Sequence, residues 1–302
     1  MKVLLTGAAG QLGQALIASA PPGLELVASS RNGGPSQRAL DLANASVCRE
    51  AVEEYRPDWV LNAGAYTAVD KAEAEPELAH AVNGGAARAF AEAIREHGGH
   101  MLQLSTDFVF NGQQGSPYRV DQRRDPLGVY GASKASGEEA VEELLGGRGQ
   151  SVVLRTSWVM GPVGKNFALK MLQLHREREQ LSVVADQVGC PSSTLNLARA
   201  CWKVITSNRQ GLELPSVLHW CDGGATSWYD VSVAVGELGM DLGLLERAAT
   251  VNPISTADYP TPATRPGYSL LDCQASRTAL KLEAQQWRSA LRDVMQAIPS
   301  NP

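Results

Sequence analysis

Short apolar runs alternate with amphipathic stretches over the first half of the chain. Five such runs predict buried strands, over residues 2–6, 24–29, 59–62, 100–104 and 151–155. The intervening stretches predict a helix after Gly13 that runs through Ala18, a helix over residues 75–97, and another that ends at Gly146. This alternation predicts an α/β protein with a Rossmann-type, doubly wound parallel sheet.

The alternation weakens in the second half. We expect a helix over residues 166–179, a strand over 181–184 and an amphipathic helix over 195–206 that returns to the sheet. Residues 253–266 are rich in proline, with too few apolar positions for a core, and should wrap the surface or cover a ligand. We therefore predict a smaller, discontinuous substrate-binding domain (about 155–187 plus 223–302) beside a dinucleotide-binding domain (1–154 plus about 188–222).

Composition narrows the classes of function. The 302 residues are 44% hydrophobic, enough for a large core, and the net charge of −5 without a basic run argues against a nucleic-acid partner. Five scattered cysteines without Cys-x-x-Cys spacing predict reduced, mostly buried thiols, and we expect no metal site. No signal peptide and no apolar run of about 18 residues is visible, so we expect a soluble, cytoplasmic protein with no membrane contact.

A glycine-rich turn follows the first predicted strand directly. Its glycines are spaced three apart, so the backbone can turn tightly and approach a pyrophosphate, while the next helix offers unpaired amides. An ordinary tight loop is the alternative. The strand-turn-helix context favours a dinucleotide site formed by Gly7, Gly10, Gln11, Leu12 and Gly13.

The second predicted strand ends without the carboxylate that NAD-selective sites usually place there. Arg31 occupies this place and is suited to a 2′-phosphate, although a solvated loop arginine is nearly as probable a reading. We expect NADPH as cofactor, with NADH as an alternative. Further cofactor contacts are expected from Asp41 and Leu42, near the adenine, and from small residues after the third predicted strand, Ala63, Gly64, Ala65 and Thr67.

Tyr130 and Lys134 are four positions apart and lie on one face of a helix. An ammonium near a phenol favours the phenolate, which suits Tyr130 to proton transfer. A surface tyrosine packed on a lysine stem is the alternative. Thr106, at the end of a predicted strand, supplies a second hydroxyl.

With Gly7-x-x-Gly10-x-x-Gly13, Ser105-Thr106-Asp107 and Tyr130-x-x-x-Lys134 in this order, the chain resembles the extended short-chain dehydrogenase/reductase family. Longer segments, over residues 67–73, 105–110, 155–158 and 261–266, resemble its dTDP-4-dehydrorhamnose reductases. The resemblance implies NADPH-dependent reduction of the C4 keto group of a nucleotide sugar, dTDP-4-dehydro-L-rhamnose, to dTDP-L-rhamnose.

The resemblance also implies roles for individual residues. Tyr130 becomes the proton donor, Lys134 lowers its pKa and holds the nicotinamide ribose, and Thr106 hydrogen-bonds the C4 oxygen. Substrate contacts are expected from Thr106, Asp107, Val109, Phe110, Trp158 and Arg265. Trp158 is as well suited to core packing, and Arg265, which could meet the diphosphate, to the plain surface.

Two other classes compete with a reductase. One is a related lyase or isomerase that uses bound NAD to dehydrate or epimerise a nucleotide sugar. Dehydratases of this fold follow the threonine with an Asp-Glu pair, but here Phe108 follows Asp107. Non-catalytic relatives tend to lose the tyrosine or the lysine, and both are present. Some reductases of this family carry a glutamate early in the first helix that binds magnesium between subunits. Ala15 stands there, so we expect a monomer or a homodimer without a metal bridge.

Overall fold

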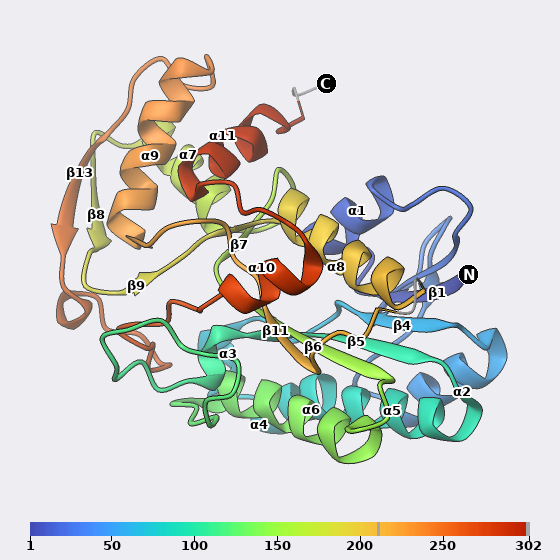
Figure 1. Cartoon of the computed structure of the whole chain (residues 1–302). Helices are drawn as coiled ribbons and strands as arrows, with labels where there is room; N and C mark the ends of the chain where they lie inside the picture. Colours follow the sequence, from blue (N-terminus) through green and yellow to red (C-terminus); the bar gives the residue numbers. More distant parts are fainter. Residues whose placement is uncertain (210–211, 300–302) are drawn as a thin grey trace.

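Seven parallel strands form a central sheet in the order β11-β6-β5-β4-β1-β2-β3 (Figure 1). The computed structural model describes residues 1–209 and 212–299. At residues 208 and 209 it describes the backbone but not the side chains. The strands are β1 (Lys2–Thr6), β2 (Glu25–Ser30), β3 (Arg38–Ala39), β4 (Trp59–Asn62), β5 (His100–Thr106), β6 (Ser151–Thr156) and β11 (Val217–His219). From β1 the chain builds the sheet outward to β3 on one side and then, from β4, outward to β11 on the other, so the predicted doubly wound, Rossmann-type sheet is confirmed.

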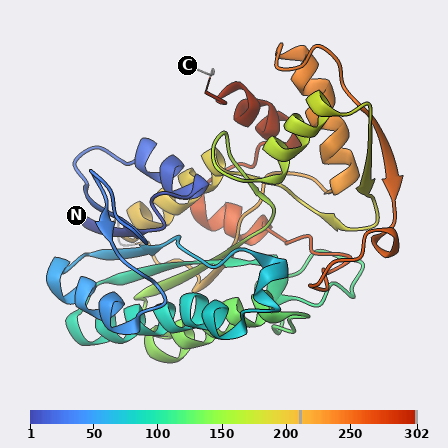
Figure 2. The same cartoon turned by 180° about the vertical axis from the view of Figure 1, so that it is seen from behind.

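Helices cover both faces of the sheet (Figures 1 and 2). One face carries α1 (Gln11–Ala18), α8 (Thr194–Arg209) and α10 (Gln274–Leu280); the other carries α2 (Ala45–Tyr55), α5 (Ala86–His97) and α6 (Val129–Leu145). A separate hydrophobic cluster fills each side, because the strands are buried on both faces. The carboxyl ends of β1, β4 and β5 are thereby free to present loops to a ligand.

A second group of elements lies beside the carboxyl ends of the strands (Figure 1). It contains α7 (Phe167–Glu177), α9 (Trp228–Asp241) and α11 (Trp287–Gln296), with β8 (Gln180–Val184) paired in parallel to β13 (Thr250–Ile254). Two short pairs link it inward: β7 (Val159–Met160) with β10 (Ser192–Ser193), and β9 (Val188–Gly189) with β12 (Thr226–Ser227). The domain boundaries given above stay a prediction.

One strand forms where none was predicted. Strand β13 includes Pro253, inside the proline-rich segment that was expected to wrap the surface or cover a ligand. Its residues are exposed or half-buried, so pairing with β8 rather than burial forms this strand, and no apolar pattern marks it. A short 3₁₀ turn (η3, Thr256–Asp258) follows.

The helix predicted over residues 75–97 is also not uniform. It divides into α4 (Pro76–His80), a π-helical turn (η1, Ala81–Gly85) and α5, after the short α3 (Val69–Ala72). The π turn packs closely on α6, since a Cβ on Gly84 would lie 2.9 Å from the Ser136 hydroxyl and one on Gly137 would lie 2.5 Å from the Asn83 carbonyl oxygen. Such turns are frequent at functional sites.

The cysteine prediction is confirmed: all five thiols are free and buried. No helix in the described part of the chain is long and apolar enough to cross a membrane.

Candidate active site

The glycine turn between β1 and α1 lies against the loop that follows β4. Gly7 has a φ of +69°, and a Cβ on it would lie 2.6 Å from the Gly64 Cα. A Cβ on Gly13 would lie 2.2 Å from the Gly7 carbonyl oxygen, so neither position accepts a side chain. Leu42 also packs against Gly64, since a Cβ on Gly64 would lie 2.6 Å from the Leu42 Cδ1. The structure therefore brings together Gly7, Gly13, Leu42 and Gly64, as the cofactor prediction requires.

A buried polar chain runs from this turn across the ends of three strands. The Gly64 amide donates to the Thr6 hydroxyl (2.9 Å), which donates to the side-chain oxygen Oδ1 of Asn62 (2.6 Å). Asn62 Nδ2 donates to Gln103 Oε1 (2.7 Å), and Gln103 Nε2 donates to the Leu104 carbonyl oxygen (2.8 Å). That carbonyl also accepts from Lys134 Nζ (2.6 Å). The chain connects the cofactor turn with the predicted catalytic lysine.

Arg31 and Asp41 lie together at the edge of the predicted cofactor site. Arg31 Nε is 4.0 Å from an Asp41 carboxylate oxygen, and both side chains are more than half exposed. An exposed pair of this kind contributes little to stability, so Arg31 remains available to a 2′-phosphate at small cost. The predicted contacts of Gly10, Leu12, Ala63, Ala65 and Thr67 with cofactor stay predictions.

Tyr130 and Lys134 project from the first turns of α6. Gly131 permits close packing, since a Cβ there would lie 2.3 Å from the Phe108 carbonyl oxygen. Gly128 at the N-cap offers no side chain, and the Glu73 carboxylate accepts from the Val129 amide instead (2.8 Å). Glu73 therefore fixes the start of the helix that carries Tyr130.

The protonation of Tyr130 differs from the expectation. Burial raises the pKa of Tyr130 to about 12; the hydrogen bond with Thr106 lowers it and the Asp107 charge raises it. We expected Lys134 to lower this pKa, but its ammonium is bonded to the Leu104 carbonyl oxygen. Tyr130 is therefore protonated at neutral pH and able to donate its proton.

Lys134 is itself buried, with 4% of its surface exposed, and burial lowers its pKa to about 8. Glu138 raises this pKa from one helical turn away, and it is held by Arg155 in a two-pronged ion pair (2.9 and 2.7 Å). Arg124 adds a third contact at 3.2 Å. Lys134 is thus kept charged near neutral pH despite its burial.

Thr106 and Asp107 lie where β5 ends and a short 3₁₀ turn (η2, Asp107–Val109) begins. The Thr106 hydroxyl donates to Asp107 Oδ1 (3.0 Å) and accepts from the Phe108 amide (3.2 Å). Burial raises the pKa of Asp107 to about 6. Thr106 and Asp107 thus form one hydrogen-bonded pair at the carboxyl end of the sheet.

The remaining predicted substrate residues differ in position. Val109 and Phe110 are fully buried, and Phe110 stacks on Tyr118 with 4.3 Å between ring centroids, so both side chains pack in the hydrophobic core. Trp158 stacks on Trp228 at 3.7 Å and has a φ of +44°, unusual for a bulky residue. Contact of Val109, Phe110 and Trp158 with substrate stays a prediction.

Arg265 is already engaged within the chain. Its guanidinium bonds both carboxylate oxygens of Asp70 (2.9 and 2.8 Å) and the Thr261 hydroxyl (2.6 Å). The proline-rich segment is therefore pinned to α3, on the cofactor side of the molecule. Contact of Arg265 with a diphosphate would require this pair to open and stays a prediction.

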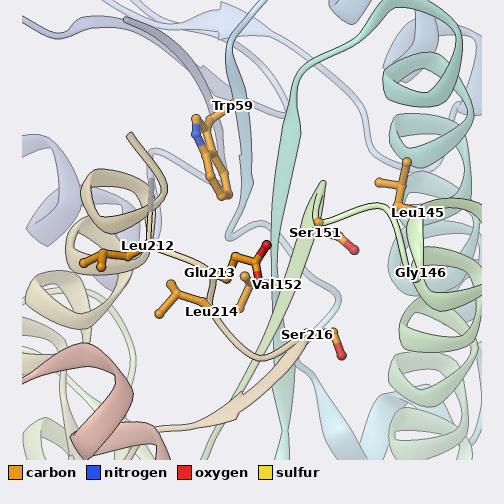
Figure 3. Close-up of a pocket in the computed structure, with 11 residues that line it drawn as sticks. Trp59, Leu145, Gly146, Ser151, Val152, Leu212, Glu213, Leu214 and Ser216 are labelled. Atoms are coloured by element: carbon orange, nitrogen blue, oxygen red, sulfur yellow. The ribbon is translucent and has the colours of Figure 1, made fainter. Parts of the chain in front are cut away.

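A cavity of about 520 Å³ lies at the other end of the sheet (Figure 3). It is lined by the starts of β4 and β6 (Trp59, Ser151) and by Leu212 to Ser216. Parallel sheets bind ligands at the carboxyl ends of their strands, so this cavity is separate from the catalytic group. Within residues 1–209 and 212–299, no cluster of His, Cys, Asp or Glu is arranged to hold a metal ion; metal independence stays a prediction.

Sequence reasoning assigned no role to three residues that the structure places at the site. Glu138 was detectable, because it follows Lys134 by four positions on the same helix face. Glu73 lies in a segment that carried the family resemblance. Asn83 bonds the Tyr66 backbone (2.9 and 3.1 Å) and the Ser133 hydroxyl (2.9 Å) from within the π turn, which no sequence pattern indicated.

Comparison with known proteins agrees with this geometry. The family model described as RmlD substrate binding domain matches residues 1–299. A dTDP-4-dehydrorhamnose reductase from Salmonella typhimurium is 35% identical over 295 residues, covering 98% of this chain and 97% of its own length.

Solved structures agree as well. A dTDP-4-dehydrorhamnose reductase from Clostridium acetobutylicum superposes with a TM-score of 0.87 at 32% identity, covering 98% of both chains. One from Bacillus anthracis, in complex with NADP, has a TM-score of 0.84 at 31% identity, covering 97% of this chain and 98% of its own.

Proposed function

Because this chain belongs to the RmlD family of dTDP-4-dehydrorhamnose reductases, we propose that it uses NADPH to reduce the C4 keto group of dTDP-4-dehydro-L-rhamnose, giving dTDP-L-rhamnose. The observation that carries the proposal is the position of Tyr130 and Lys134 on α6, with Lys134 joined through a buried polar chain to the glycine turn and with Thr106 at the carboxyl end of β5.

The glycine turn fits a dinucleotide. Gly7, Gly13 and Gly64 leave backbone without side chains at the start of α1, where amide groups face a phosphate favourably. Arg31 would hold the 2′-phosphate, and Leu42 and Gly64 would pack against the nucleoside. When bound, NADPH supplies the hydride that the carbonyl carbon receives.

Residues of this chain supply the proton that the C4 oxygen receives. As the carbonyl carbon accepts a hydride, negative charge develops on the C4 oxygen, and two hydroxyl groups stabilise it by hydrogen bonding. Tyr130 donates its proton to that oxygen, since its raised pKa keeps the proton in place until the oxygen becomes basic enough to take it. Thr106 orients the oxygen.

Lys134 is held charged by Glu138, with its ammonium on the Leu104 carbonyl oxygen. We propose that it turns from that carbonyl, once cofactor and substrate are bound, to stabilise the Tyr130 phenolate that remains after proton transfer. The Arg155–Glu138 pair and the Glu73 contact at the start of α6 hold both residues on the helix face toward the strand ends. We propose that the enzyme acts as a monomer or a homodimer without a bridging metal.

The direct test is an absorbance assay of NADPH with the purified protein and dTDP-4-dehydro-L-rhamnose. We expect NADPH consumption that depends on the keto sugar, with dTDP-L-rhamnose as the product by chromatography. The matched variants are Thr106→Val, expected to lower kcat by about 10²–10³-fold through loss of one oxyanion donor, and Thr278→Val, an exposed position on α10, as the control. Absence of turnover with the native protein would refute the proposal.

A further inference from the structure

The segment that follows β6 lies directly on the cofactor turn. Gln11, the first residue of α1, donates from Nε2 to the Val159 carbonyl oxygen (3.0 Å), a partner 148 positions further along the chain. Gln11 Oε1 accepts from Asn166 Nδ2 (3.1 Å). A Cβ on Gly164 would lie 3.6 Å from the Gln11 Cβ, so the backbone of this segment packs on the side chain as well.

The two bonds fix the orientation of the Gln11 amide. Asn166 Oδ1 accepts from the Leu169 amide (3.0 Å) and caps α7, which leaves its Nδ2 as the donor toward Gln11. The Val159 carbonyl can accept only. Gln11 therefore meets both partners in one orientation, with its nitrogen toward Val159 and its oxygen toward Asn166.

The bond to Val159 supports a strained residue. Trp158, immediately before it, has a φ of +44°, a conformation that bulky side chains adopt only where surrounding contacts enforce it. The Trp158 carbonyl oxygen accepts from the Ser192 amide (3.2 Å), and its ring stacks on Trp228. Gln11 holds the next carbonyl in the chain, so the backbone at Trp158 is fixed from both the cofactor side and the substrate side.

We propose that Gln11 is a positioning residue that ties the cofactor turn to the Trp158 backbone, so that bound cofactor favours the substrate-binding arrangement. This rests on the proposed function, which puts NADPH at the turn, and on the predicted contact of Trp158 with the dTDP sugar. The side chain of Gln11 thus acts on the sugar nucleotide through Trp158, while its backbone belongs to the phosphate turn. Because coupling is reciprocal, bound sugar nucleotide equally favours cofactor binding.

The test compares Gln11→Ala and Gln11→Glu with the native enzyme. Both remove the donor to Val159, while glutamate keeps the acceptor for Asn166 and the length of the side chain. Gln14→Ala is the matched control, since Gln14 is exposed on the same helix and donates to Ala9 within the turn (3.0 Å). Steady-state kinetics with the keto sugar at saturating NADPH give KM and kcat, and NADPH fluorescence gives its Kd.

We expect both Gln11 variants to raise KM for the keto sugar by about 5- to 30-fold, the effect of one or two hydrogen bonds. The kcat of both variants and the NADPH Kd of Gln11→Ala should change by less than about threefold. Gln11→Glu should also bind NADPH more weakly, because its carboxylate lies at the phosphate turn. Gln14→Ala should match the native enzyme. An unchanged KM in both variants, a loss confined to NADPH affinity, or a defect in Gln11→Ala that Gln11→Glu does not share would overturn the proposal.

Failure of the proposed function can be distinguished from failure of the inference about Gln11. If the native protein does not turn over the keto sugar, calorimetry with dTDP still measures coupling. Saturating NADP⁺ should then tighten dTDP binding in the native protein and in Gln14→Ala, and the tightening should be lost in both Gln11 variants. An equal effect of NADP⁺ in all four proteins would overturn the inference.

Discussion

Substitution of Gly7 by alanine tests whether the glycine turn is the cofactor cradle. Two costs arise at this position. The φ of +69° is left-handed, which costs a residue with a side chain about 1–2 kcal/mol, offset by about 0.4–1 kcal/mol from reduced freedom of the unfolded chain. The new Cβ would also lie 2.6 Å from the Gly64 Cα and 2.7 Å from its nitrogen, both backbone atoms.

That contact cannot relax cheaply. The Gly64 amide is bonded to Thr6, and the polar chain beyond it ends on Lys134, so a shift of Gly64 disturbs buried hydrogen bonds. Overpacking of this kind costs about 1–3 kcal/mol. Gly23→Ala is a matched control: its φ is +75° and a Cβ there would meet no atom within 4 Å, so it carries the conformational cost alone.

Two measurements separate the variants. In urea unfolding, Gly7→Ala should be about 1–3 kcal/mol less stable than Gly23→Ala, the overpacking cost. In NADPH titrations followed by nicotinamide fluorescence, Gly7→Ala should bind at least about tenfold more weakly, the loss of about one charge-assisted contact as the amides at the start of α1 move. An NADPH Kd for Gly7→Ala within twofold of Gly23→Ala would refute the assignment of this turn as the cofactor site.

Three further predictions follow from single residues. The pKa of Lys134 is lowered from 10.5 to about 8 in the folded protein. Between about pH 8 and 10.5 the unfolded chain therefore binds more protons than the folded one, so Lys134 makes the free energy of unfolding rise with pH by about 3 kcal/mol. Lys134→Met should remove that rise in urea unfolding. Arg31→Ala should reduce the preference for NADPH over NADH by about 10- to 100-fold in Kd, and equal affinities in the native protein would contradict a 2′-phosphate contact. Dialysis against a chelator should leave turnover and molecular mass unchanged, whereas a rate loss restored by magnesium would reveal a metal role.

The sheet and the predicted catalytic pair, Tyr130 and Lys134, were accessible from the sequence because each depends on local pattern. Buried parallel strands are continuous apolar runs, and the spacing of Tyr130 and Lys134 fixes their common helix face. The glycines at positions 7 and 13 were identifiable for the same reason, since a strand, a turn and a helix follow one another directly.

The features that sequence reasoning missed depend on contacts between distant segments. Strand β13 forms by pairing with β8 and is exposed, so no hydrophobic pattern marks it. The raised pKa of Tyr130 reflects burial by the completed fold, while spacing alone suggested the opposite direction. The Asp70–Arg265 pair joins positions 195 apart, and neither residue indicates the other locally.

The most direct test of the account is the turnover of Tyr130→Phe. The change removes one hydroxyl from a residue whose ring packs edge-on against Phe108, with 5.6 Å between centroids, so the fold should be retained. With NADPH and dTDP-4-dehydro-L-rhamnose, kcat should fall by about 10²–10⁴-fold, the usual contribution of a general acid, while the NADPH Kd stays near that of the native enzyme. Retention of more than half of the native kcat would contradict Tyr130 as the proton donor.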